Sequence, residues 1–266
     1  MNDSLSEIDA VFDYHQRTKH NLNRYAQALG YMDWKNQPDP FRRYDGAPFV
    51  PLKQGNGRSG PLYDALFSGS ILPSPLNFSF ISQLFYNSMA LSAWKHIPGG
   101  AAWPLRVNPS SGNLHPTESY LLIGPQCSPH LEQGLYHYRP DQHALDKRRA
   151  FKPALWETIS EQLPHEGFLI GLSSIYWRET WKYGERAFRY CHHDVGHAIG
   201  AITISSVSLG WNAEVIDTLT DDTTALFLGC DEEGIEAEHV DCLIAIYPHS
   251  NQKQEGERIG LHLKDQ

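Results

Sequence analysis

Lys182 and Tyr183 are adjacent proton-carrying side chains in a segment rich in basic residues. On a helix, Lys182, Arg186 and Arg189 lie on one face because they are spaced by three and four residues. A lysine that is partly desolvated near another cation releases its proton more readily, so the pair is a candidate for general acid–base catalysis. The alternative is a solvated basic face whose charges pair with nearby acidic residues, Glu179 and Glu185.

A second candidate site is the segment from Arg106 to Glu118, which contains two prolines, a glycine, two serines and two asparagines. Such a loop can present hydrogen-bond donors to the edge of a flat ring, with close approach of the backbone at Gly112. The donors are supplied by Ser110, Ser111 and Asn113. Arg106 can neutralise a phosphate or an anionic ring. An ordinary turn stabilised by Asn and Ser side chains is the alternative.

The third segment is His192 to Ala201, in which Gly196 and Gly200 are four residues apart. On a helix they leave one side of the backbone bare, which suits tight packing against a partner helix or a flat ring. His193 and His197 have the spacing of two zinc ligands on a helix. Zinc needs three or four ligands, and no later Cys or His pattern completes the set, so no metal site is predicted.

Composition and charge exclude several classes of protein. The net charge is −9, from 22 basic and 31 acidic residues, and the basic residues are dispersed, which argues against nucleic acid as a partner. The polar, acidic start lacks the features of a secretion signal, and no apolar run is long enough to span a bilayer. We therefore expect a cytoplasmic protein without a membrane partner, whose four cysteines are reduced.

The elements that must position these residues mix helices and strands without strict alternation, which favours an α+β architecture. Helical spacing predicts helices over 7–30, 78–94, 153–163, 179–190, 193–209 and 221–228, with a break near residues 191–192. Strands are expected over 119–124, 134–138, 168–173 and 241–247. Residues 36–62 are expected to form an extended arm that packs through 47–52, and 147–149 a solvated loop or a helix start. The expected division is a helix and arm over 1–60, one domain over 61–250 and a loose tail over 251–266.

Taken in order, these segments resemble nitroreductase-like FMN-dependent oxidoreductases, and most of all the SagB-type branch that oxidises azolines in modified peptides. The likeness covers roughly residues 60–248. It is carried by the loop 109–118, the strand 134–138 and the segment 182–190. It is also carried by the motif 194–197, which lies in a helix expected to end at 209–211. Each motif alone is weak, but the ordered set is specific.

The resemblance implies a nitroreductase-like fold, with a mostly antiparallel sheet packed by helices, and FMN bound without a covalent bond at a subunit interface. The implied cofactor-binding residues are Arg106, Pro109, Ser110, Ser111, Gly112, Asn113, Arg186, Arg189, Gly196 and His197. Lys182 and Tyr183 fall on the position of the lysine–tyrosine pair that removes a proton in azoline-oxidising members. Hydride would then pass from the substrate to N5 of the flavin, which carries the redox chemistry.

Two departures from the family pattern leave alternatives open. The arginine-rich segment that usually grips the flavin phosphate corresponds here to 65–75, which contains no arginine. Either Arg58, Arg106 or Arg189 binds the phosphate instead, or the affinity for flavin is reduced. The resemblance also implies either a homodimer or pairing with a second nitroreductase-like domain, with the helix 7–30 and the arm as exchange elements. A general nitroreductase or quinone reductase using NAD(P)H and a non-catalytic binding or scaffold subunit of the same fold are the rival functions.

Overall fold

The computed structural model describes residues 6–53, 60–127, 129–230, 233–249 and 259–262. Its centre is a seven-stranded sheet in the order β1-β6-β5-β4-β7-β9-β8, and all six neighbouring pairs are antiparallel. The strands are β1 (Phe49–Pro51), β4 (Thr117–Ile123), β5 (Gly134–Arg139), β6 (Ala144–Ala150), β7 (Phe168–Ser174), β8 (Trp211–Ile216) and β9 (His239–Pro248). The predicted α+β class with a mostly antiparallel sheet is confirmed.

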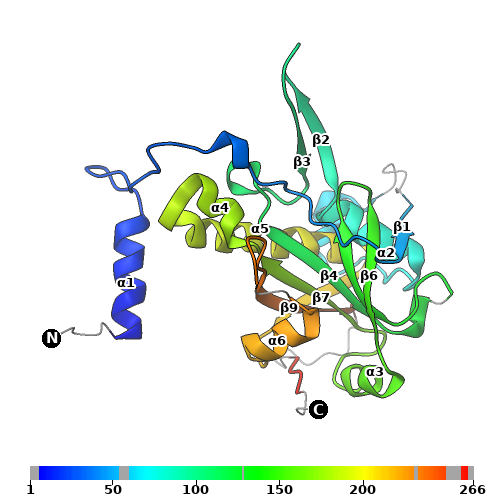
Figure 1. Cartoon of the computed structure of the whole chain (residues 1–266). Coiled ribbons are helices and arrows are strands. Elements are labelled where there is room, and N and C mark those ends of the chain that lie inside the picture. The colour runs from blue at the N-terminus through cyan, green and yellow to red at the C-terminus, as the bar shows by residue number, and fades with distance from the viewer. Residues whose placement is uncertain (1–5, 54–59, 128, 231–232, 250–258, 263–266) are drawn as a thin grey trace.

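The helices are α1 (Glu7–Thr18), α2 (Phe78–Ser88), α3 (Pro153–Ser160), α4 (Tyr176–Tyr183), α5 (Ala187–Ser208) and α6 (Asp221–Leu228). Helix α1 stands away from the sheet, whereas the other helices lie around it, as Figure 1 shows. The long α5 packs against α2, where the Ser205 hydroxyl donates to the Leu84 carbonyl at 3.0 Å. None of the helices in the described parts of the chain is long and apolar enough to cross a bilayer.

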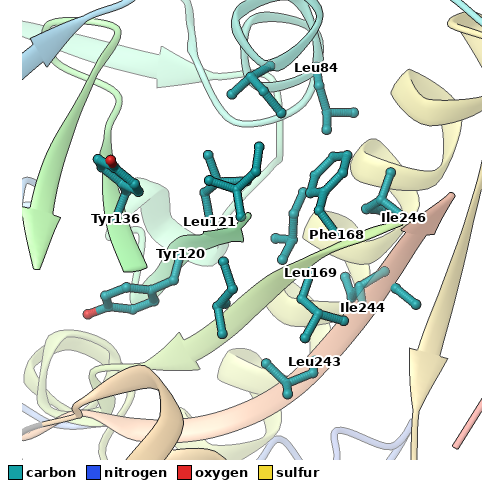
Figure 2. Close-up of a cluster of buried hydrophobic side chains, with 14 of the residues drawn as sticks. Leu84, Tyr120, Leu121, Tyr136, Phe168, Leu169, Leu243, Ile244 and Ile246 are labelled. Carbon is teal, nitrogen blue, oxygen red and sulfur yellow. The ribbon is translucent and has the colours of Figure 1, made fainter. Parts of the chain in front are cut away.

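The hydrophobic core lies between the central strands and α2 and α5. Every residue of β4 and β7 is buried, because these strands are covered on both faces. Figure 2 shows part of this cluster: Leu84, Tyr120, Leu121, Tyr136, Phe168, Leu169, Leu243, Ile244 and Ile246. The candidate loop comes directly before β4, and the helix that carries Lys182 and Tyr183 comes directly after β7. These two buried strands therefore give the candidate site residues a rigid base.

The N-terminal segment consists of α1 and an arm that contacts α4. Figure 1 shows α1 standing away from the sheet, and Ile8, Val11 and Phe12 on it are exposed. The arm then crosses α4, where the indole N–H of Trp181 donates to the Asp33 carbonyl at 2.7 Å. Within the arm, Phe49–Pro51 form β1 and pair with β6, so the expected packing of 47–52 on the body is confirmed.

The N-terminal helix is shorter than expected, since α1 ends at Thr18 rather than near residue 30. Lys19 is already extended, with φ −82° and ψ 145°. Beyond it, Asn21 and Arg24 exchange backbone hydrogen bonds, and the His20 ring accepts from the N–H of Ala26. These local bonds satisfy the backbone in another way and compete with a continued helix.

The helix expected over 78–94 ends at Ser88, and residues after it form a β-hairpin of β2 (Leu91–His96) and β3 (Ala102–Arg106). This hairpin projects from the body in Figure 1. A short apolar run fits a helix and a strand equally well, so periodicity did not separate them. Residues 91–96 form a strand because they pair with 102–106, beginning with Leu91 opposite Arg106.

Three further expectations were wrong. The interruption after α4 lies at Gly184, with φ +55°, and not near Cys191, which lies inside α5. Residues 147–149 belong to strand β6, because both neighbouring strands pair with it. Within the expected loose tail, Ile259 and Leu261 are buried, and the Leu261 N–H donates to the Thr218 hydroxyl at 2.8 Å.

Candidate active site

The loop between β3 and β4 is held in an unusual backbone conformation. Gly112, Asn113 and His115 all have positive φ, of 64°, 61° and 48°. The Asn113 amide donates to the Pro104 carbonyl at 2.8 Å, and the Ser110 hydroxyl accepts from the His115 N–H at 2.8 Å. Positive φ in two non-glycine residues costs free energy, so these bonds must hold the loop in place.

Asp194 of α5 ties this loop to the helix. Its carboxylate accepts from the Ser111 N–H at 3.0 and 3.1 Å and from the Ser111 hydroxyl at 3.1 Å. Burial raises the pKa of Asp194, and the hydrogen bonds from the serines oppose the shift. The loop and α5, which are far apart in the sequence, are therefore one rigid unit at this point.

Gly112 lies directly against the lysine–tyrosine pair. A β-carbon built on Gly112 would lie 2.7 Å from Oη of Tyr183 and 2.9 Å from Nζ of Lys182. The two proton-carrying atoms thus converge on the glycine of the loop. Burial raises the pKa of Tyr183 to about 12, so its phenol keeps its proton at neutral pH. The structure brings together two segments that the sequence had marked separately.

The three arginines expected at the phosphate or ring edge contact the N-terminal segment. Arg106 is only 6% exposed and donates to the Pro40 carbonyl, and burial lowers its pKa to about 10. Arg186 donates to the carbonyl of Thr18 at 3.0 Å, and Arg189 donates to the hydroxyl of the same residue at 2.9 Å. Arg58, the remaining alternative, lies outside the described residues.

The face of α5 that was expected to meet a ring is open. Gly196 and His197 are exposed, and Pro109 of the loop is exposed as well. A β-carbon built on Gly196 or Gly200 would meet nothing within 4 Å. Two cavities, of about 170 and 840 Å³, lie elsewhere, and neither has Gly112 among its lining residues. The backbone at Gly196 and Gly200 therefore has open space on the side where a β-carbon would be.

Sequence reasoning missed a buried ion network behind the loop. Arg178, fully buried, donates to Oε1 of Glu118 at 2.8 Å, to Oε2 of Glu236 at 2.6 Å and to the His115 carbonyl at 2.9 Å. Although burial opposes ionisation, Arg178 and His137 hold the pKa of Glu118 to about 2. No usable signal for this network was present in the sequence, because a single sequence does not show which charged residue of a helix faces the core.

Histidine and cysteine do not gather into a metal centre. Cys191 is fully buried, whereas His193 and His197 are exposed. Across the residues that the structure describes, no group of three His, Cys, Asp or Glu side chains is placed to hold a metal ion.

Comparison with known proteins identifies the architecture. A candidate nitroreductase of Anabaena variabilis superposes with a TM-score of 0.66 at 23% identity, over 88% of this chain and 45% of that one. A chain of the Escherichia coli microcin synthetase McbBCD superposes with a TM-score of 0.52 at 16% identity, over 94% of this chain and 85% of that one. This chain has the nitroreductase fold.

Relatives found by sequence agree with the nitroreductase fold. The candidate nitroreductase MJ1384 of Methanocaldococcus jannaschii is 30% identical over 38% of this chain and 52% of its own length. The trifolitoxin-processing protein TfxB of Rhizobium leguminosarum bv. trifolii is 26% identical over 77% of this chain and 62% of its own. The chain thus spans about half to three fifths of these relatives. No protein-family model matches it.

The resemblance drawn from the sequence is confirmed at the level of the nitroreductase-like superfamily. Two of its neighbours are named for microcin synthesis and trifolitoxin processing, which agrees with the expected likeness to the SagB-type branch. The roles of individual residues remain predictions that rest on the geometry described above.

Proposed function

We propose that the chain is an FMN-dependent oxidoreductase of the nitroreductase type. The observation that carries this proposal is the convergence of Lys182 Nζ and Tyr183 Oη on Gly112 of the loop. The nitroreductase fold supports it, as do the names of the structural and sequence relatives. A proton-transfer pair held against a loop of fixed backbone suits an oxidation in which a side chain takes the proton and a cofactor takes the hydride.

The residues present fit the ring of a flavin. Gly112 has a backbone conformation that other residues rarely adopt, and a β-carbon on Gly196 or Gly200 of α5 would meet open space. Ser110, Ser111 and Asn113 fix the loop through bonds to the His115 N–H, to Asp194 of α5 and to the Pro104 carbonyl, and Pro109 and His197 are exposed. Bound FMN would supply the redox chemistry by accepting a hydride equivalent.

The chain's own part in the reaction is proton transfer. Lys182 accepts the proton from the substrate carbon, since the phenol of Tyr183 keeps its own proton and a neutral phenol is not an effective base. Tyr183 keeps its phenolic proton near neutral pH and donates a hydrogen bond to the reacting group or to the amine. The proton and the hydride together account for the two electrons and two hydrogens removed from the substrate.

We further propose that the substrate is an azoline or a similar small ring in a modified peptide. The names of TfxB and of the microcin synthetase support a peptide substrate, and the Lys182–Tyr183 pair supports oxidation that begins with removal of a proton. A general nitroreductase or quinone reductase would need only an open flavin face and access for NAD(P)H, so Lys182 would then be dispensable.

A binding or scaffold subunit without catalysis is the second candidate. The observation that favours it is that Arg106, Arg186 and Arg189 all donate to the N-terminal segment instead of pointing to an open surface. For the enzyme, the flavin phosphate would have to displace these contacts or meet a second chain.

An absorption spectrum of the purified protein separates the two candidates. We expect a flavin band in the visible range and release of about one FMN per chain on denaturation, because one loop site is present per chain. Incubation of the apoprotein with FMN should restore the band. A colourless protein that FMN cannot reconstitute would contradict the enzymatic assignment and support the scaffold.

A further inference from the structure

Glu179 is a buried carboxyl group next to the proposed proton-transfer pair. It is 0% exposed, and neither of its oxygens has a hydrogen-bond partner in the described structure. It precedes Lys182 by three residues and Tyr183 by four, so the three side chains share one face of α4. Since buried polar groups in folded proteins are nearly always hydrogen-bonded, an orphaned acid at this position needs an explanation.

The groups that face Glu179 come from two helices. Lys182 and Tyr183 lie on its own helix, and Asp194 and Cys191 approach from α5. Asp194 accepts three hydrogen bonds from Ser111, whereas Glu179 accepts none. Two neighbouring buried carboxyls do not both ionise readily, and the one with donors keeps the charge.

The charge state of Glu179 follows from this environment. Burial, and after it the negative charge of Asp194, raises the pKa of Glu179 to about 9, while Lys182 opposes the shift only in part. The alternative is a buried ion pair between Glu179 and Lys182. An ion pair would require a hydrogen bond between their charged atoms, and Glu179 makes none in the described structure.

We propose that Glu179 stays protonated at neutral pH and so leaves the proposed base Lys182 without a buried counter-ion. Glu179 is then a positioning residue, because it acts through Lys182 and touches no substrate. A carboxylate in its place would attract the ammonium form of Lys182 and oppose proton acceptance. The inference rests on the proposed role of Lys182, but the proton on Glu179 can be measured without any substrate.

The first test is the pH dependence of stability in wild type and Glu179→Gln. The pKa of Glu179 is raised from its ordinary 4.5 to about 9 on folding, so between these values the native state binds one more proton than the unfolded chain. Wild-type stability should therefore fall as the pH rises through this window. The unfolding equilibrium constant should rise relative to that of the variant by up to about tenfold per pH unit.

Denaturant titrations of both proteins from pH 5 to pH 9 give this comparison. Glu185→Gln is the matched control, because Glu185 lies six residues on, is exposed and pairs with Arg17. The control should keep the wild-type slope. Parallel slopes for wild type and Glu179→Gln would overturn the proposal, since they would mean that Glu179 is ionised and paired at neutral pH. Asp241, whose pKa burial raises to about 7, contributes equally to all three proteins.

The second test follows the amine of Lys182 by competitive acetylation and peptide mass analysis. If Glu179 is neutral, its replacement by Gln should leave the labelling rate of Lys182 unchanged at pH 7. Near pH 10, where Glu179 is charged in wild type only, Lys182 should label faster in the variant. An ion pair predicts the reverse order of effects, with faster labelling in Glu179→Gln already at pH 7, and would overturn the proposal.

Wild-type protein alone gives a third readout should Glu179→Gln fail to fold. Its infrared spectrum should lose a protonated-carboxyl band between pH 8 and pH 10, above the range in which Asp241 titrates. Absence of that change would refute the inference. Failure of the proposed function is seen separately, because unchanged turnover in Lys182→Ala would remove the role of the lysine without altering the proton on Glu179.

Discussion

At the scale of the residue, the side chains that carry protons are set apart by their surroundings rather than by their types. Lys182 is partly exposed beside Gly112, Tyr183 is a neutral phenol, and Glu179 on the same face is an orphaned acid. Their neighbours on the loop and on α5 decide which of them gives or takes a proton.

Replacement of the lysine tests the proposed base. We expect Lys182→Ala to bind FMN as wild type does and to lose about 10²- to 10⁴-fold in substrate oxidation, the usual contribution of a general base. Flavin absorbance and single-turnover reduction measure the two effects. Lys152→Ala, at an exposed position before α3, is the control and should behave as wild type. Unchanged turnover in Lys182→Ala would mean that another group removes the proton.

At the scale of the element, the loop between β3 and β4 and the helices α4 and α5 form one unit. Asp194 bonds Ser111 from one side, and Arg178 bonds the His115 carbonyl from another. Gly112 lies against Lys182 and Tyr183 at the end of α4, so a side chain at this position has little room. The loop was predicted from its turn-forming residues, but its contact with α4 was not.

A side chain at Gly112 should disturb both the loop and the pair. Gly112→Ala places a residue at φ +64° with a β-carbon within 3 Å of Lys182 and Tyr183. The backbone alone should cost about 1–2 kcal/mol in the free energy of unfolding, and the contact should add to this and reduce substrate oxidation. Denaturant unfolding and turnover measure both effects.

Gly229→Ala provides the matched control, because Gly229 has a similar φ of +61° and open space around its missing β-carbon. It caps α6 and should show the backbone cost alone, with wild-type turnover. If both variants lost the same stability and neither lost turnover, the close approach of Gly112 to the pair would not matter for function.

At the scale of the whole molecule, the parts that extend from the body are apolar. Ile8, Val11 and Phe12 are exposed on α1, and Trp94 and Ile97 are exposed at the β2–β3 hairpin. Figure 1 shows both elements projecting from the sheet. We propose that residues 1–60 act as an exchange arm on the domain formed by 61–250, and that the arm packs on a second copy or on a second nitroreductase-like domain.

Sedimentation should therefore give a dimer near twice the chain mass of 30.2 kDa. Phe12→Glu places a charge on the apolar face of α1 and should shift the equilibrium towards monomer. Ala10→Glu adds the same charge at an exposed position on the opposite side of α1, two residues before Phe12, and should leave the dimer intact. An active monomer that carries flavin would rule out a site shared between two chains.

The sequence by itself determined what depends on neighbouring residues in the chain. It predicted the loop rich in proline, serine and glycine and the short helix α6, because turn chemistry and helix signals are local properties. It also singled out the Lys182–Tyr183 pair, because side-chain type is read directly from the sequence. The order of these motifs was also enough to indicate the superfamily, since the order is a property of the sequence alone.

Only the tertiary structure decided which groups meet. In the folded chain the arginines predicted to bind the flavin donate hydrogen bonds to the N-terminal segment. Gly112 lies against Lys182, and Glu179 is buried near Asp194. It also turned the residues after Ser88 into a hairpin, because strand pairing outweighed an ambiguous periodicity. Burial and partner choice depend on residues far apart in the chain, and they set the protonation states on which the proposed chemistry rests.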